Sequence, residues 1–122
     1  MVSKHILVVD DEPSICFTVS MLLKLEGYSV ADAPDGRAGL QSALENPPDV
    51  ILSDVNMPHM DGYALLAAVR SNRTLNRTRL VLLTEEVDPA LAQQAGGARP
   101  DACLGKPFTR DQLLAVLRSV AP

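Results

Sequence analysis

Short apolar runs of strand length alternate along this chain with segments of helical spacing, and no other feature restricts its fold as strongly. The runs are Ile6 to Val9, Tyr28 to Ala31, Val50 to Leu52, Leu80 to Leu83 and Ala102 to Leu104. Helical stripes follow them at Ile15, Val19, Leu22 and Leu23; Leu40, Ala43 and Leu44; Leu65, Ala68 and Val69; Val87, Leu91 and Ala95; and Leu113, Val116, Leu117 and Val120. Five strands alternating with five helices predict a doubly wound α/β domain, a parallel sheet with helices on both faces.

Composition narrows the class further. At 122 residues and 47% hydrophobic content we expect one domain, residues 1–122, with no linker. A net charge of -4 argues against direct nucleic-acid binding. The amino terminus fits neither a signal peptide nor a membrane span, so we expect a cytoplasmic protein without membrane contact. Cys16 and Cys103 lack metal-ligand spacing, and we expect two buried thiols and no disulfide.

Polar residues follow four of the five predicted strands. Asp10 and Asp11 follow the first strand, Asp54 the third and Thr84 the fourth, while the fifth leads to Lys106. In the common order 2-1-3-4-5 these four strands are neighbours, and the second strand is an edge. Ligands of such sheets bind at the carboxyl ends of the strands. These five side chains are therefore predicted to form one site.

Each of these residues also has a purely structural explanation. Asp11 could cap a helix that begins at Pro13, Asp54 could form an Asx turn, Thr84 could be a cap, and Lys106 could be solvated. For Thr84 and Lys106 taken singly, the structural explanation is favoured. Taken together, three carboxylates, a hydroxyl and an ammonium at one sheet edge favour a functional site.

The chemistry of this set favours a metal-assisted phosphoryl acceptor. Clustered carboxylates repel one another unless a cation joins them, and an all-oxygen site with few protein ligands suits Mg²⁺. A carboxylate can also act as a nucleophile toward phosphorus and form an aspartyl phosphate. Mg²⁺ and Lys106 would then neutralise the phosphoryl oxygens, and the Thr84 hydroxyl could donate to one of them.

The motifs "ILVVDDEP", "SDVNMPHMDG", "LLTE" and "GKPF" together make the chain similar to response-regulator receiver domains, over essentially its whole length. The order 2-1-3-4-5 in a flavodoxin-like sheet is a known property of that family. The resemblance implies that Asp54 is the phosphoacceptor and that Thr84 and Lys106 contact the phosphoryl group. It also implies that Asp10, Asp11, Asp54 and the backbone carbonyl of Asn56 hold Mg²⁺.

The resemblance also implies partners and a signalling role rather than an enzyme acting on other molecules. The phosphodonor would be a sensor histidine kinase or a phosphotransfer protein. Phosphorylation would reshape the surface formed by the helix expected near Val87 to Ala95, the fifth strand and the last helix. That surface would serve a downstream protein or an output domain, or a homodimer.

Two positions depart from the family pattern. Receivers usually carry Tyr or Phe three residues before the lysine, where this chain has Cys103, and a small residue after the threonine, where it has Glu85. Both positions concern signal output, so a receiver-like module that is never phosphorylated stays an alternative.

Two other protein classes fit these residues less well. A phosphatase with an Asp nucleophile would need a second Asp at position 56, where this chain has Asn56. A flavin-binding protein would find acid after the first strand, where it needs phosphate-cradling groups.

The remaining polar features are predicted to be surface residues. His5 and His59 lack partners at ligand spacing. Four arginines lie before the fourth strand, at the end of the sheet away from the acidic residues, and are expected in a solvated loop, with a docking patch for an acidic partner as the alternative: Arg70, Arg73, Arg77 and Arg79.

Overall fold

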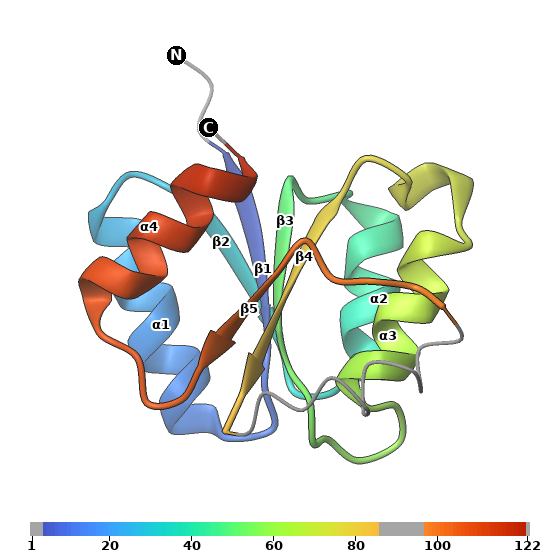
Figure 1. The fold of residues 1–122 in the computed structure, drawn as a ribbon, viewed down its shortest axis with the longest axis horizontal. Helices are drawn as coiled ribbons and strands as arrows, with labels where there is room; N and C mark the ends of the chain where they lie inside the picture. The colour runs from blue at the N-terminus through green and yellow to red at the C-terminus, as the bar shows by residue number, and fades with distance from the viewer. Residues whose placement is uncertain (1–3, 86–96, 122) are drawn as a thin grey trace.

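The computed structural model describes residues 4–85 and 97–121, and it contains one parallel five-stranded sheet (Figure 1). The strands are β1 (His5–Val9), β2 (Ser29–Ala33), β3 (Val50–Asp54), β4 (Arg79–Thr84) and β5 (Ala102–Gly105). They are arranged in the order β2-β1-β3-β4-β5, with every neighbouring pair parallel. The predicted fold class and strand order are confirmed.

Helices cover both faces of the sheet. They are α1 (Pro13–Leu25), α2 (Gly36–Glu45), α3 (Gly62–Arg70) and α4 (Arg110–Val120), with a short 3-10 helix, η1, at Arg73–Leu75. Helices α1 and α4 lie on one face, and α2 and α3 on the other (Figure 1). Four α-helices therefore stand in the described residues, where the sequence predicted five in the whole chain. The expected helix near Val87 to Ala95 lies outside those residues.

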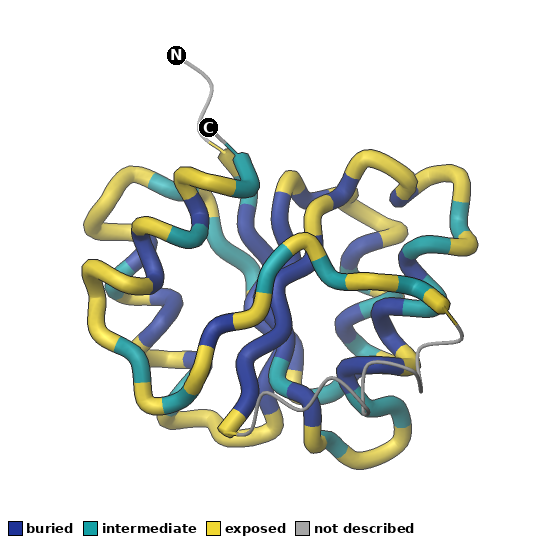
Figure 2. The backbone as a smooth tube through the Cα atoms, viewed as in Figure 1, coloured by how far each residue is buried: buried dark blue, intermediate teal, exposed yellow. Residues whose placement is uncertain are grey.

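The central strands are apolar on both faces because each face is covered by helices. Along β4, Leu80 and Leu82 face the core under α2 and α3, while Val81 and Leu83 face the core under α1 and α4. The strands are correspondingly buried in the middle of the molecule, and exposed residues gather on the outer turns (Figure 2). This alternation, with a period of two residues, gives two hydrophobic cores on a single sheet.

Two burial predictions are wrong. Cys16 is buried as expected, but Cys103 is exposed, and both thiols are free. In the strand register Cys103 pairs with Leu82, which is covered; Cys103 lies one strand further out, on the edge strand β5. Leu44, expected on the buried stripe of α2, is 40% exposed because Ala43 takes the core position beside it.

The arginine cluster is only partly a solvated loop. Arg70 ends α3, and its guanidinium donates to the Asp101 carboxylate at 2.6 Å and to the Thr78 carbonyl at 3.0 Å. Asp101 also accepts a hydrogen bond of 2.8 Å from the backbone N–H of Leu80. Arg70 therefore ties α3 to the beginnings of β4 and β5. Arg73 and Arg77 are exposed, as predicted.

Candidate functional site

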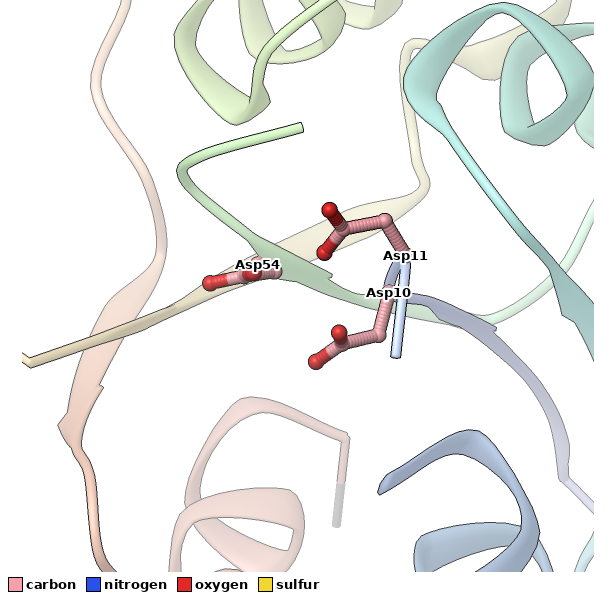
Figure 3. A group of neighbouring side chains, drawn as sticks. All are labelled: Asp10, Asp11 and Asp54. Carbon is pink, nitrogen blue, oxygen red and sulfur yellow. The ribbon is translucent and has the colours of Figure 1, made fainter. Parts of the chain in front are cut away.

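Three carboxylates meet where β1 and β3 end. One oxygen each of Asp10, Asp11 and Asp54 lies within 4.8 Å of the other two, and the three side chains extend to the same side of the sheet edge (Figure 3). Asp10 is buried, Asp11 is exposed and Asp54 is intermediate. The cluster is thus anchored in the protein on one side and open to solvent on the other.

The turn after β1 fixes the Asp10 carboxylate. Its Oδ1 accepts a hydrogen bond of 2.9 Å from the backbone N–H of Glu12, and its own N–H donates to the Ala33 carbonyl at 3.1 Å. Helix α1 begins at Pro13, with Glu12 as N-cap and no side-chain capping bond. The structural alternative for Asp11, a helix cap, is therefore wrong, and its carboxylate is available to the cluster.

The loop between β3 and α3 holds Asp54 in place. Asp54 Oδ1 accepts from the backbone N–H of Val55 at 2.9 Å, and the Gly62 N–H donates to the Val55 carbonyl at 2.8 Å, which closes the loop. A Cβ on Gly62 would lie too close to the Asp54 carbonyl oxygen, so only glycine fits at this position. Asp61 then caps α3 by accepting from the Ala64 N–H at 2.8 Å.

Lys106 joins the carboxylates from the end of β5. Its Nζ lies 3.1 Å from Asp10 Oδ2 and 3.2 Å from Asp54 Oδ1, and its side chain is 14% exposed. Its backbone N–H donates to the Thr84 carbonyl at 2.7 Å, which places it beside the end of β4. The structural alternative for Lys106, a solvated side chain, is wrong.

These contacts shift the ionisation of two groups. Burial raises the pKa of Asp54, as does the nearby Asp10 carboxylate, and the Lys106 ammonium only partly opposes them. Burial disfavours the Lys106 ammonium, but its hydrogen bond to Asp10 and the charges of Asp10 and Asp54 outweigh burial, so the pKa of Lys106 is raised. The cleft therefore holds more negative charge than its one ammonium neutralises.

The other predicted residues lie around this cluster. Thr84 is buried at the end of β4, opposite Gly105 in the register. Asn56 is exposed in the loop after Asp54, and His59, also exposed, has a positive φ of 67°. His5 lies at the start of β1, where its ring contacts Ser29 and Asn46.

Sequence reasoning missed the backbone donors of Glu12 and Val55, which orient two of the carboxylates. No residue-type signal identifies them, since every non-proline residue has a backbone N–H.

The donor set fits a small hard cation. All three side-chain donors are carboxylate oxygens, and the exposed position of Asp11 leaves a side from which water can complete a coordination shell. Mg²⁺ binds through one or two carboxylates and keeps several waters. Mg²⁺ therefore suits this site.

The fold and the site are those of a phosphoacceptor-type α/β signalling domain, and the comparisons with known proteins agree. Residues 6–118 match the response regulator receiver domain, and the chain belongs to this family. It is a CheY-like receiver domain of two-component signalling systems.

Individual relatives show how far the likeness extends. A probable chemotaxis protein CheY of Rhizobium etli is 34% identical over 94% of this chain and 90% of its own length. The structure of the chemotaxis protein CheY4 of Vibrio cholerae is 39% identical, covers 98% of this chain and 99% of that one, and gives a TM-score of 0.91. The receiver domain of the sensor histidine kinase PA1611 from Pseudomonas aeruginosa PAO1 carries a magnesium ion coordinated in its active-site cleft. It is 27% identical, with a TM-score of 0.87 over 99% of this chain and 100% of that one.

Other relatives are longer. The chain spans about half the length of the transcriptional regulatory proteins that it matches, 49% in one case and 50% in another. Among residues 4–85 and 97–121, no helix has both the length and the apolar character to cross a membrane.

Proposed function

We propose that residues 1–122 act as one phosphoacceptor unit, in which Asp54 takes a phosphoryl group from a sensor histidine kinase or a phosphotransfer protein. The observation that carries the proposal is the Lys106 ammonium, which lies 3.1 Å from Asp10 and 3.2 Å from Asp54 in a three-carboxylate cluster. A cation and a set of metal-binding oxygens thus surround a carboxylate that the Val55 N–H already orients. Phosphoryl transfer requires this combination of positioning and neutralisation.

The step is a transfer between two nucleophiles. An Asp54 carboxylate oxygen forms a bond to phosphorus, the bond between phosphorus and the donor's imidazole nitrogen breaks, and the imidazole leaves with the electron pair. Lys106 and the Thr84 hydroxyl contact the phosphoryl oxygens. Hydrolysis of the acyl phosphate by water returns Asp54 to its free state. The chain acts in these reactions on its own Asp54 only.

Asp10, Asp11, Asp54 and the Asn56 backbone carbonyl would hold Mg²⁺, which neutralises the phosphoryl oxygens when bound. Asp10 and Asp11 stand on the β1 side of the cleft, opposite the approach of Lys106 from β5. Because Asp11 is exposed, an Asp11→Ala variant should keep its fold. Calorimetry should show Mg²⁺ binding weakened by at least about tenfold, which is the loss of roughly 1.4 kcal/mol. Equal affinity would remove Asp11 from the ligand set.

Output would use the surface beyond the cleft. A change at Thr84 or Glu85 would be carried into the segment that follows, and from there to the surface that β5 and α4 complete. A downstream protein, an output domain or a second copy would bind there. Because Cys103 replaces the usual aromatic ring, this change would depend on Thr84 and the segment after it.

Intact-mass analysis tests the proposal. The protein is incubated with Mg²⁺ and acetyl phosphate, and the wild type should gain the mass of one phosphoryl group. Asp54→Asn should gain none. Asp111→Asn is the matched control, since its side chain is 92% exposed on α4 and makes no contact with the three carboxylates or Lys106 among those the structure shows, and it should react as the wild type does. A phosphorylated Asp54→Asn protein would show that the acceptor is another residue.

A further inference from the structure

Five arginines gather at the end of the sheet opposite the three carboxylates. Strands β1 and β3 end at the carboxylates, whereas the parallel strands β4 and β5 begin beside the arginines. The Arg70 guanidinium joins the group, because it donates to the Thr78 carbonyl at 3.0 Å and to the Arg99 carbonyl at 3.3 Å. We call the five residues the arginine cluster: Arg70, Arg73, Arg77, Arg79 and Arg99.

The arginine cluster makes one end of an acidic chain strongly basic. It holds five of the eleven basic residues, and no acidic residue occurs between Asp61 and Glu85. Asp49 stands beside Arg79, whose backbone N–H donates to the Asp49 carbonyl. The Asp49 carboxylate, however, accepts a hydrogen bond of 2.7 Å from the backbone N–H of His5. The positive charge is therefore concentrated on a chain whose net charge is -4.

The carboxylate of Asp101 neutralises only part of the cluster. It accepts from Arg70 at 2.6 Å and from the Leu80 N–H at 2.8 Å, and Arg79 approaches it only to 3.5 Å. Three members of the cluster are exposed and make no ion pair within residues 4–85 and 97–121: Arg73, Arg77 and Arg99. Their guanidinium groups are available to a partner.

The backbone that carries the cluster is anchored to the core. Leu75, the last residue of η1, is 0% exposed and packs with α2 and α3. Asn72 caps η1 by accepting from the Thr74 N–H at 2.9 Å. The buried Thr78 hydroxyl donates to the Pro48 carbonyl at 2.9 Å. Because these contacts fix the backbone before any partner arrives, less conformational entropy is lost on binding.

The chemistry of the cluster favours a short acidic segment as its partner. All five basic residues are arginines, whose planar guanidinium pairs with two oxygens of one carboxylate or phosphate. A duplex or a membrane surface would extend past the cluster to the acidic remainder of the chain, which repels it. No large hydrophobic side chain is exposed beside the cluster, since those exposed in the described residues are Phe17, Met21, Leu25 and Leu44. Base stacking and membrane insertion therefore have no anchor here.

From these observations we infer that the arginine cluster is a docking surface for an acidic segment of a protein partner. The segment presents several Asp or Glu side chains to Arg73, Arg77 and Arg99. Because the cluster and the carboxylates lie at opposite ends of the sheet, the partner leaves the cleft at Asp54 open to a phosphodonor. The inference goes beyond the proposed function and does not depend on it.

Fluorescence anisotropy with a labelled oligoglutamate peptide tests the inference without any phosphodonor. The test variant is Arg73→Gln with Arg77→Gln. The matched control is Arg37→Gln with Arg118→Gln, which removes the same charge from exposed positions on α2 and α4. Mixed-sequence duplex DNA and phosphatidylglycerol vesicles serve as competitors, and each titration is run at low and at physiological ionic strength.

We expect the test variant to raise the Kd for oligoglutamate by about tenfold or more, because two exposed charge pairs are lost. The control should change it by less than about twofold, since its charges lie away from the peptide and are screened. The dependence of Kd on salt should be shallower for the test variant. Arg99→Gln leaves η1 intact and should also raise Kd, by about threefold, so a folding defect in the double variant cannot produce the whole pattern.

Three outcomes would overturn the inference. The first is a wild type that does not bind oligoglutamate at low ionic strength. The second is an equal rise in Kd for the test variant and the control, because net charge alone would then explain binding. The third is tighter binding of DNA or vesicles than of oligoglutamate, lost in the test variant, which would identify a phosphate polymer or a membrane surface as the occupant.

Discussion

Replacing Lys106 by methionine tests the electrostatics of the cleft. The substitution removes the ammonium and keeps an unbranched side chain of similar length. It leaves the Asp10 carboxylate, whose side chain is 0% exposed, without its ion-pair partner, and Asp54 loses the same contact. Breaking a buried ion pair costs about 3 to 5 kcal/mol. Asp10 keeps the Glu12 N–H and the cleft is open at Asp11, so we expect a loss near the lower limit, about 3 kcal/mol.

Urea unfolding followed by far-ultraviolet circular dichroism measures this loss, since the chain contains no tryptophan. Lys24→Met is the control, because Lys24 is exposed in the last turn of α1. This substitution should change the free energy of unfolding only a little. The pKa of Lys106 is raised above its ordinary 10.5, so its contribution to stability is present below that pH and is lost as pH rises through the raised value. The difference in free energy of unfolding between the wild type and Lys106→Met should therefore disappear at strongly alkaline pH.

Magnesium adds a second readout of the same variant. A ligand at one hundred times its dissociation constant stabilises a fold by about 2.7 kcal/mol. Lys106→Met, whose carboxylates lack an ammonium, should bind Mg²⁺ more tightly than the wild type and recover much of its lost stability. A Lys106→Met protein that is as stable as Lys24→Met without Mg²⁺, and that gains no more from Mg²⁺ than the wild type, would refute the ion-pair account.

Three further predictions concern residues outside the cluster. His59→Val should destabilise the fold by about 1 kcal/mol or more, because position 59 has a φ of 67°, which a β-branched residue tolerates poorly. His59→Asn should destabilise it by little. Thermal unfolding of the two variants tests this difference. Asp101→Ala should lower the free energy of unfolding by on the order of 2 kcal/mol, because an arginine and a backbone N–H of β4 lose their shared acceptor. Asp111→Ala should lower it by almost nothing, and urea unfolding measures both variants. Burial raises the pKa of the Cys16 thiol to about 11 from 9.0, so ionisation in the unfolded chain should lower stability between those two pH values. Cys16→Ala should lose less stability over that interval, and parallel pH profiles would contradict the assignment.

The sequence predicted the covered parallel sheet and the gathering of the site because both follow from period and position, whereas the strand order was that of known folds of this class. Apolar runs that are buried on both faces require covered parallel strands, and polar residues placed directly after such runs must share one edge. Asp10, Asp11, Asp54 and Lys106 are together for this reason. The resemblance to receivers added the residue roles, which the side chains alone left open.

What the sequence did not predict depends on tertiary contacts. Cys103 is apolar enough for a core, but it lies on the edge strand of the sheet. No local sequence pattern indicates which residues of an edge strand are covered by helices. Arg70 reads as one more charge in a basic segment, yet its guanidinium ties α3 to Asp101, thirty-one residues later in the chain. Such a pairing depends on the register of two strands, which composition does not encode.

Mapping the phosphorylated residue tests whether Asp54 is the acceptor and whether Mg²⁺ is needed. The protein is treated with Mg²⁺ and acetyl phosphate, and the acyl phosphate is reduced with borohydride, which converts the modified aspartate into homoserine. Peptide mass spectrometry then locates the change. We expect homoserine at position 54 alone, and none when Mg²⁺ is chelated before the donor is added. Homoserine at position 10 or 11, or at position 54 in equal amount without Mg²⁺, would contradict this expectation.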